Sequence, residues 1–246
     1  MDILSNSIPF KAMILAAGRG ERMRPLTDNM PKPLLQAGGK ALIEYHLENL
    51  ARAGFAEIII NHAYLGGKIK SALGKGERYG VKIYYSHEPL VLETAGGIAN
   101  ALPLLTNECQ NQPFLVVNAD IYCEIDFALM LPVLQHMQAN PALDLAHLVL
   151  VDNPFHHSEG DFALVADQVS LCGDEKFTFS GIGVYQPRLF HAVRRYTATK
   201  LAPLLRQAIT EEKVRGVYFN GVWMDVGTPA RLSDLDMLLN NRRIDV

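Results

Sequence analysis

The segment from Ala12 to Pro33 places the strongest constraint on what this chain of 246 residues can fold into. Its apolar run, Ala12 to Ala17, is typical of a strand buried in a parallel sheet. The run ends at Gly18-Arg19-Gly20, where glycine permits positive φ and a close approach of ligand to backbone. Cations follow at Arg22 and Lys32. A strand that leads into a glycine turn with free N–H groups and nearby cations predicts a polyphosphate-binding site.

Two common phosphate-binding motifs do not fit this segment. The chain contains no G-x-x-x-x-G-K-[ST] run, which excludes a Walker A loop. The dinucleotide fingerprint G-x-G-x-x-G has Met23 at its third glycine, and the predicted second strand ends at Asn61 where an acidic residue is expected. A turn whose arginines are merely solvated is the alternative that this pattern leaves open.

The first half of the chain alternates between strand and helix patterns. Strands are predicted at Glu57–Asn61, Val81–Tyr85 and Phe114–Val117, and helices at Ala41–Ala53, Lys68–Leu73 and Gly97–Leu105. This order predicts an α/β fold with a mainly parallel sheet, whose ligands bind at the carboxyl ends of the strands. We therefore expect Gly18, Asn61, Glu88 and Asp120 along one edge of the sheet.

The second half is richer in strand patterns. Single strands are predicted at Leu143–Val151 and Phe177–Tyr185, with a hairpin that joins Phe162–Val165 to Gln168–Leu171. A second hairpin is predicted between Val214–Phe219 and Val222–Val226, because Asn220-Gly221 is a favoured hairpin turn. Helices are expected at Lys200–Thr210 and Pro229–Leu239.

Composition excludes several classes of protein. Apolar residues make up 49% and charged residues 20%, and the net charge of −3 gives no general attraction to nucleic acid or to anionic membranes. No apolar run approaches the length that spans a bilayer. The three cysteines have no metal-type spacing, which favours reduced thiols in a cytoplasmic protein. Residues 1–10 lack signal-peptide features and are interpreted as a loose extension before one domain at residues 11–246.

Two acidic residues follow apolar strands. Asp120 ends the run N-A-D, and Asp225 lies in W-M-D-V-G-T. A single aspartate at the end of a strand is usually a turn former or a helix cap. If both strands end at the same edge, however, two carboxylates converge opposite the cationic glycine turn. Two carboxylates with water and phosphate oxygens are a usual way to hold Mg²⁺.

The motifs together resemble a known family. L-A-A-G-R-G-E-R-M-R-P-L-T and P-K-P, with the acidic pair, resemble the sugar-1-phosphate nucleotidyltransferases at nearly every position of the family pattern. Glu21 departs from the threonine or serine of many members. The resemblance covers Lys11 to about Leu239. It implies one Rossmann-like (GT-A-like) nucleotidyltransferase domain with a small β-rich part that binds the sugar, and Mg²⁺ as cofactor.

The resemblance also implies roles for individual residues. Those expected to act in catalysis are Arg22, Lys32, Asp120 and Asp225, and the last two are the expected metal ligands. The residues expected to bind the nucleotide are Leu15, Ala17, Gly18, Gly20, Glu21, Arg22, Lys32, Glu88, Pro89, Thr94 and Gly96. The residues expected to contact the sugar phosphate are Asn118, Asp161 and Gly181. Arg24 is left outside the core set as a candidate salt-bridge partner, and Gly96-Gly97 could instead simply start a helix.

The spelling G-E-R-M-R-P and the run from Leu150 to Phe162 resemble one branch of the family, the N-acetylmuramate-1-phosphate uridylyltransferases of bacterial cell-wall recycling. In this run, His156 and His157 are read as part of a substrate-pocket loop or as a solvated turn. The branch implies UTP and N-acetylmuramate 1-phosphate as substrates of a monomer or weak homo-oligomer. The alternatives are a guanylyl- or thymidylyltransferase of the same family, a D-x-D glycosyltransferase, and a catalytically silent sugar-nucleotide sensor.

Overall fold

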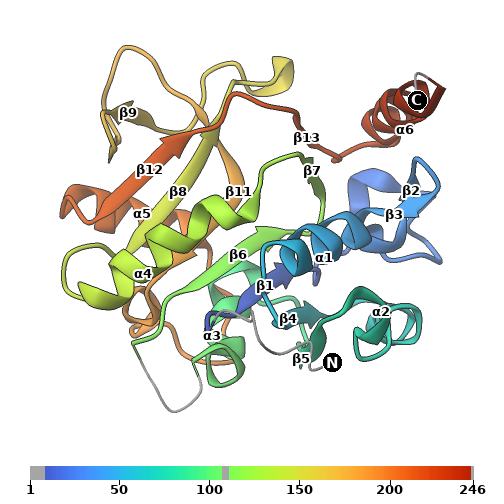
Figure 1. Ribbon diagram of the computed structural model, residues 1–246, viewed down its shortest axis with the longest axis horizontal. Coiled ribbons are helices and arrows are strands. Elements are labelled where there is room, and N and C mark those ends of the chain that lie inside the picture. The colour runs from blue at the N-terminus through green and yellow to red at the C-terminus, as the bar shows by residue number, and fades with distance from the viewer. Residues whose placement is uncertain (1–8, 107–110, 245–246) are drawn as a thin grey trace.

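The computed structural model describes residues 9–106 and 111–244, and a nine-stranded sheet forms its centre (Figure 1). The order of the strands across this sheet is β5-β4-β1-β6-β11-β8-β12-β10-β9. Their bounds are β1 Ala12–Leu15, β4 Glu57–His62, β5 Lys82–His87, β6 Phe114–Asn118, β8 Ala146–Val151, β9 Ala163–Val165, β10 Gln168–Ser170, β11 Thr178–Tyr185 and β12 Val214–Tyr218. Two small two-stranded sheets pair β2 (Gln36–Ala37) with β3 (Lys40–Ala41) and β7 (Ile121–Cys123) with β13 (Trp223–Asp225).

The predicted mainly parallel sheet is confirmed. β5, β4, β1 and β6 are parallel to one another, and β12 is parallel to β8. The strands that run the opposite way are β11, which lies between β6 and β8, and β10, which lies between β12 and β9 near the far edge. Phe162–Val165 and Gln168–Leu171 therefore form a hairpin close to the predicted bounds.

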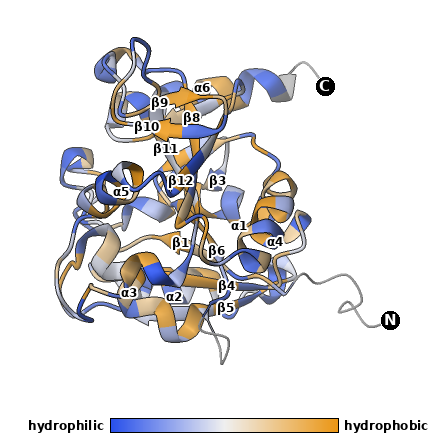
Figure 2. Ribbon diagram, turned by 90° about the vertical axis from the view of Figure 1, so that its left-hand side faces the viewer, coloured by the Kyte–Doolittle hydropathy of each residue, from blue (hydrophilic) through white to orange (hydrophobic). Residues whose placement is uncertain are grey.

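Helices cover both faces of the sheet, and Figure 2 shows α1 and α4 on one side and α3 and α5 on the other. Strand side chains alternate between the two layers, so Ile58 and Ile60 pack under α1 whereas Ile59 packs under α3. Burial on both faces explains why the central strands are continuous apolar runs. The helices are α1 Leu42–Arg52, α2 Gly66–Leu73, α3 Glu93–Leu105, α4 Leu131–Ala139, α5 Leu201–Thr210 and α6 Pro229–Ile244.

Helix α6 packs on a third apolar cluster, away from the main sheet. Its Leu235 is buried with Met23 and Tyr122, and the Gly38 N–H donates to Asp236 Oδ1 over 2.7 Å. Figure 1 shows α6 beside the β2–β3 pair at one end of the molecule. Helix α6 therefore packs against the middle of the predicted phosphate-binding segment, at Met23.

Two sequence predictions are wrong. Val214–Phe219 and Val222–Val226 do not form a hairpin: β12 pairs with β8 and β10, whereas β13 pairs with β7. Helix α3 begins at Glu93 and not at Gly97, because the carbonyl of Thr199 accepts the N–H groups of its first turn, Ala95 and Gly96. Helix α4 and strands β2, β3 and β7 were not predicted from the sequence.

Residues 1–8 of the predicted N-terminal extension lie outside the described residues. Phe10, at the end of the same segment, is buried in the core, and the carbonyl of Pro9 accepts a hydrogen bond of 2.5 Å from Gln112 Nε2. Packing of the chain thus begins before Lys11.

Candidate active site

The carboxyl ends of β1, β4 and β6 border a cleft made of three adjoining pockets. The central pocket, about 220 Å³, contains eight of the predicted site residues: Leu15, Ala17, Gly18, Lys32, Glu88, Thr94, Asn118 and Asp120. A pocket of about 660 Å³ on one side adds Gly20, Glu21 and Arg22. A pocket of about 290 Å³ on the other side adds Asp161 and Gly181. The predicted phosphate and sugar residues therefore lie along one continuous cleft.

The glycine turn after β1 has a defined backbone shape. Gly20 has φ +66°, and a Cβ built on it would lie 2.9 Å from Thr27 Cγ2, so a larger residue would be strained and crowded. Thr27 Oγ1 donates to the Gly20 carbonyl over 2.8 Å. Glu21 and Arg22 lie exposed on the 3₁₀ turn that follows. Arg24 forms a salt bridge of 2.5 Å with Asp28, the role considered for it from the sequence.

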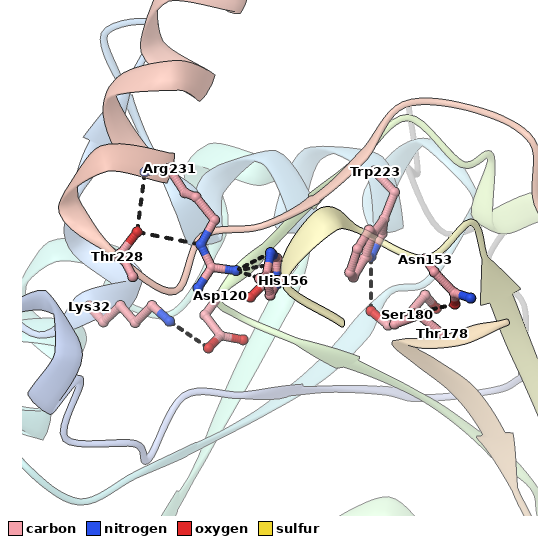
Figure 3. A network of polar contacts seen from close by, with 10 residues as sticks. Lys32, Asp120, Asn153, His156, Thr178, Ser180, Trp223, Thr228 and Arg231 are labelled. Atoms are coloured by element: carbon pink, nitrogen blue, oxygen red, sulfur yellow. Dashed lines mark hydrogen bonds and ion pairs between the residues drawn. The ribbon is translucent and has the colours of Figure 1, made fainter. Parts of the chain in front are cut away.

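Lys32 reaches the cleft from the chain segment that follows the glycine turn. It begins a 3₁₀ turn, Lys32–Leu34, that is framed by Pro31 and Pro33. Its Nζ donates to Asp120 Oδ2 over 2.6 Å (Figure 3). The lysine side chain is 9% exposed and the aspartate 43%. Asp120 is therefore the more open partner and faces the cleft with its remaining acceptor capacity.

The backbones around Asp120 and Asp225 lie side by side. In the β7–β13 pair, Asp225 is opposite Ile121, and the Val226 N–H donates to the Asp120 carbonyl over 2.8 Å. The Asp225 carboxylate does not line any of the three pockets. Instead it accepts a short hydrogen bond from Arg231 Nη1 of α6, and His156 Nε2 lies 2.9 Å from the same oxygen.

The acidic pair fits a hard divalent cation by its donors. Both carboxylates already attract cations of the chain, Lys32 at Asp120 and Arg231 at Asp225. Among the residues that the structure describes, no group of three or more His, Cys, Asp or Glu side chains could hold a metal ion. Two carboxylates completed by water and phosphate oxygens are the usual environment of Mg²⁺.

Between β4 and α3, a chain of hydrogen bonds organises the floor of the central pocket. Asn61 Oδ1 accepts from the Ala16 N–H over 2.8 Å, and Asn61 Nδ2 donates to Glu88 Oε1 over 2.6 Å. The other oxygen of Glu88 accepts from the Leu92 N–H over 3.0 Å. Burial raises the pKa of Glu88, although both hydrogen bonds oppose this shift. Glu88 thus holds the loop to Leu92 in place as well as bordering the pocket.

Two of the residues predicted to bind the nucleotide do not line any of the three pockets. Pro89 is exposed beside Glu88. Gly96 is buried against the backbones of Thr197 and Thr199, and its N–H donates to the Thr199 carbonyl over 3.1 Å. Thr94 lines the pocket from the first turn of α3. The nucleotide contacts of Pro89 and Gly96 stay predictions.

The second side pocket contains the predicted sugar residues. Gly181 lies on β11 directly against Asn118, beside a register shift between β11 and β8. Asp161 Oδ2 accepts from the Phe179 N–H over 2.8 Å, and Asp161 Oδ1 lies 3.1 Å from His157 Nε2. His156 and His157 therefore contact two different carboxylates and do not converge on one point. Trp223 donates to the Ser180 carbonyl over 2.9 Å and packs against the core.

Sequence reasoning missed three residues of the site. Glu93 lines the central and sugar-side pockets with φ +59°, a strained value of the kind that gathers at functional sites. Lys200 lines the sugar-side pocket, and Arg231 binds Asp225. Arg231 follows W-M-D-V-G-T by a few residues, so its place in the first turn of a predicted helix was the signal that could have indicated it.

The sheet and its cleft define a nucleotidyltransferase. Residues 11–155 match the profile of the nucleotidyl transferase family, and the chain belongs to this family. It is 51% identical over 232 residues to the N-acetylmuramate alpha-1-phosphate uridylyltransferase of Neisseria meningitidis serogroup B, which covers 93% of this chain and 97% of the relative. The mannose-1-phosphate guanyltransferase beta-A of Xenopus laevis is 27% identical over 89% of this chain and 61% of the relative.

Solved structures share the fold. A UDP-glucose pyrophosphorylase complexed with UDP-glucose superposes with a TM-score of 0.73 at 15% identity, covering 96% of this chain and 100% of the other. HddC from Yersinia pseudotuberculosis gives a TM-score of 0.72 at 20% identity, covering 93% and 99%. None of the helices in the described part of the chain is long and apolar enough to cross a membrane.

Proposed function

We propose that the chain is a magnesium-dependent uridylyltransferase that converts UTP and N-acetylmuramate 1-phosphate into UDP-N-acetylmuramate and pyrophosphate, a step in peptidoglycan recycling. The continuous cleft from the cationic glycine turn to the pocket of Asn118 and Asp161 carries the proposal, because it has room for a triphosphate at one end and a sugar at the other. The relative from Neisseria meningitidis supports the choice of substrates.

The reaction needs charge neutralisation more than acid–base chemistry. An oxygen of the sugar phosphate attacks the α-phosphorus of UTP, and pyrophosphate leaves with the electron pair of the broken bond. The attacking oxygen is already anionic near neutral pH. Two like charges 4 Å apart repel by about 4 kcal/mol at an effective dielectric constant of 20. The site must therefore supply cations and in-line positioning.

The glycine turn and Lys32 would supply both the cations and the positioning. The N–H groups from Gly18 to Arg22 would cradle the triphosphate, and Arg22 would neutralise the leaving pyrophosphate. Lys32 is held beside Asp120 at the centre of the cleft and would neutralise the α-phosphate. Both cations act where negative charge gathers in the transition state.

Asp120 and Asp225 would hold the magnesium ion. When bound, this ion neutralises phosphate oxygens and helps to orient the two substrates. The cations that now neutralise the two carboxylates, Lys32 and Arg231, support this assignment, because each marks a place where the chain stabilises positive charge.

Different parts of the cleft would bind the base and the sugar. Glu88, Pro89 and Thr94 would meet the uracil and ribose, and Gly96 would set the start of the helix that carries Thr94. On the other side, Asn118 and Gly181 would meet the sugar phosphate and Asp161 a sugar hydroxyl. Leu15 and Ala17 line the central pocket and would pack beside the nucleotide.

We infer that the partners are small molecules only. The net charge of −3 gives no field that would attract nucleic acid or a membrane surface. Because the proposed reaction consumes UTP, a nucleotide of the cytoplasm, we infer that the enzyme acts in the cytoplasm. A monomer or a weak homo-oligomer is sufficient, because every proposed contact comes from one chain.

A matrix of nucleoside triphosphates against sugar 1-phosphates, with pyrophosphate release as the readout, tests the proposal. UTP with N-acetylmuramate 1-phosphate should give the highest kcat/KM. Faster release with glucose or mannose 1-phosphate would overturn the substrate assignment and leave a nucleotidyltransferase. No pyrophosphate with any pair would overturn the enzymatic function itself.

A further inference from the structure

Arg231 occupies an unusual place beside the cleft. It lies in the first turn of α6, and its Nη1 donates to Asp225 Oδ1, one of the two proposed metal ligands. The same Nη1 lies 2.6 Å from His156 Nε2 (Figure 3). Its side chain is 17% exposed, so the guanidinium is partly shielded from water. The strongest contact of this cation is therefore with a carboxylate that the reaction requires for another purpose.

The guanidinium also reaches the phosphate side of the cleft. A Cβ built on Gly227 would lie 2.3 Å from Arg231 Nη2 and 3.1 Å from Asp225 Oδ2, so only glycine lets the side chain cross this point. Gly227 itself lines the pocket that contains Gly18 to Arg22, Lys32 and Asp120. Arg231 is thus separated from the proposed phosphate pocket by one glycine backbone.

The hydrogen bonds among Asp225, Arg231 and His156 cannot all form at the same time. His156 Nε2 can accept a hydrogen bond from Arg231 or donate one to Asp225, but one ring nitrogen cannot do both at once. Arg231 is the permanent cation of the cluster, because a guanidinium does not lose its proton in proteins. A guanidinium binds phosphate with the same fork of N–H groups as it binds a carboxylate.

We propose that Arg231 binds a phosphate group of the nucleoside triphosphate, and that Asp225 masks Arg231 until a divalent cation takes the Asp225 carboxylate. The inference rests on the proposed function and deepens it. A metal ion and Arg231 compete for one carboxylate, so metal loading releases the guanidinium to an incoming phosphate. Binding of the triphosphate then depends on prior loading of the metal.

The first test measures metal binding without nucleotide or turnover. Mn²⁺ is titrated into wild-type protein and Arg231→Met and followed by electron paramagnetic resonance. Removal of a competing cation should tighten Mn²⁺ binding about 5- to 150-fold, as expected for a coupling of ordinary size. Weaker or unchanged binding would overturn the proposal, because it would mean that Arg231 only holds Asp225 in position.

Arg242 provides the matched control for this titration. It lies on the same helix, carries the same charge and pairs with Glu124, away from the three pockets. Arg242→Met should leave the Mn²⁺ affinity unchanged. An equal gain in both variants would reduce the effect to net charge and overturn the specific role of Arg231.

The second test uses inorganic phosphate and pyrophosphate as probes in the absence of metal. Asp225→Asn should bind both more tightly than wild type, because Arg231 is unmasked. The double variant Asp225→Asn with Arg231→Met should lose this gain. If the double variant keeps the gain, the effect is only the loss of a negative charge and the proposal fails. Inorganic phosphate keeps this test independent of the sugar, so an incorrect substrate assignment would show in the activity matrix and not here.

Discussion

Lys32 Nζ lies 2.6 Å from Asp120 Oδ2 across the centre of the cleft. The lysine is nearly buried, so removing its partner would leave a cation with little access to water. The pair joins the phosphate segment after β1 to the end of β6, and it places one positive and one negative group where two substrates must meet. The first two predictions concern the two members of this pair, Asp120 and Lys32.

Asp120→Asn and Asp225→Asn should each lower turnover about 100-fold or more while the fold survives. The amide keeps the shape of the side chain but removes the charge that holds a divalent cation. Pyrophosphate release with magnesium as the only divalent metal measures turnover, and thermal unfolding checks the fold. Near-wild-type turnover in either variant would contradict the assignment of that residue as a metal ligand.

Lys32→Ala and Arg22→Ala should lower kcat by a larger factor than they raise KM for the sugar phosphate. Both cations would act mainly on charge that develops in the transition state. Steady-state kinetics with each substrate varied in turn measure the two effects.

Arg24→Ala is the matched control on the same segment, because Arg24 is exposed and paired with Asp28. It should change kcat little. If Lys32→Ala or Arg22→Ala raises only the KM for the sugar phosphate, that residue does not act on the triphosphate.

Asp161→Ala should reduce kcat/KM for the sugar phosphate more than it weakens UTP binding. The carboxylate borders the sugar-side pocket, and a pocket built around hydrogen-bonding groups discriminates strongly when one is removed. Asp161→Asn keeps an acceptor for the Phe179 N–H and serves as the control for backbone position. Equal losses in UTP affinity and sugar-phosphate use would contradict a role on the sugar side.

The free energy of unfolding should fall as the pH drops from about 6.5 towards 4. Burial lowers the pKa of His46, His62 and His147 to about 4, from an ordinary value of 6.5. In this window the unfolded chain binds protons that the folded protein excludes, so acid favours unfolding, by about 1.4 kcal/mol per pH unit for each histidine. Urea unfolding at several pH values measures this slope.

His62→Leu isolates one contribution to this slope. Neither ring nitrogen of His62 has a hydrogen-bond partner within the described residues, so an apolar side chain of similar size should be tolerated there near pH 7. The variant should show a shallower loss of stability in acid. An unchanged slope would show that His62 does not contribute to it.

Sequence patterns correctly predicted the strands that are buried on both faces of the sheet. β1, β4 and β6 are continuous apolar runs because helices cover both of their faces, and their carboxyl ends place Gly18, Asn61 and Asp120 at one edge. The motifs likewise led to the family, which the comparisons confirm.

Local signals failed where distant contacts decide the structure. Asn220-Gly221 favours a hairpin, but β12 gains more by pairing with β8 and β10 inside the main sheet. The start of α3 depends on the carbonyl of Thr199, more than a hundred positions along the chain. The sequence could indicate Arg231 only by its position just after W-M-D-V-G-T, because its contact with Asp225 depends on how α6 packs against the segment around Met23.

The small sheet of β7 and β13 has a consequence for the order in which the site can assemble. Asp120 follows β6 of the main sheet, whereas the strand that carries Asp225 and the helix that carries Arg231 lie about a hundred positions further along the chain. The backbones of the two aspartates are brought together by the pairing of β13 with β7. Formation of the main sheet alone would therefore leave the first carboxylate without the second.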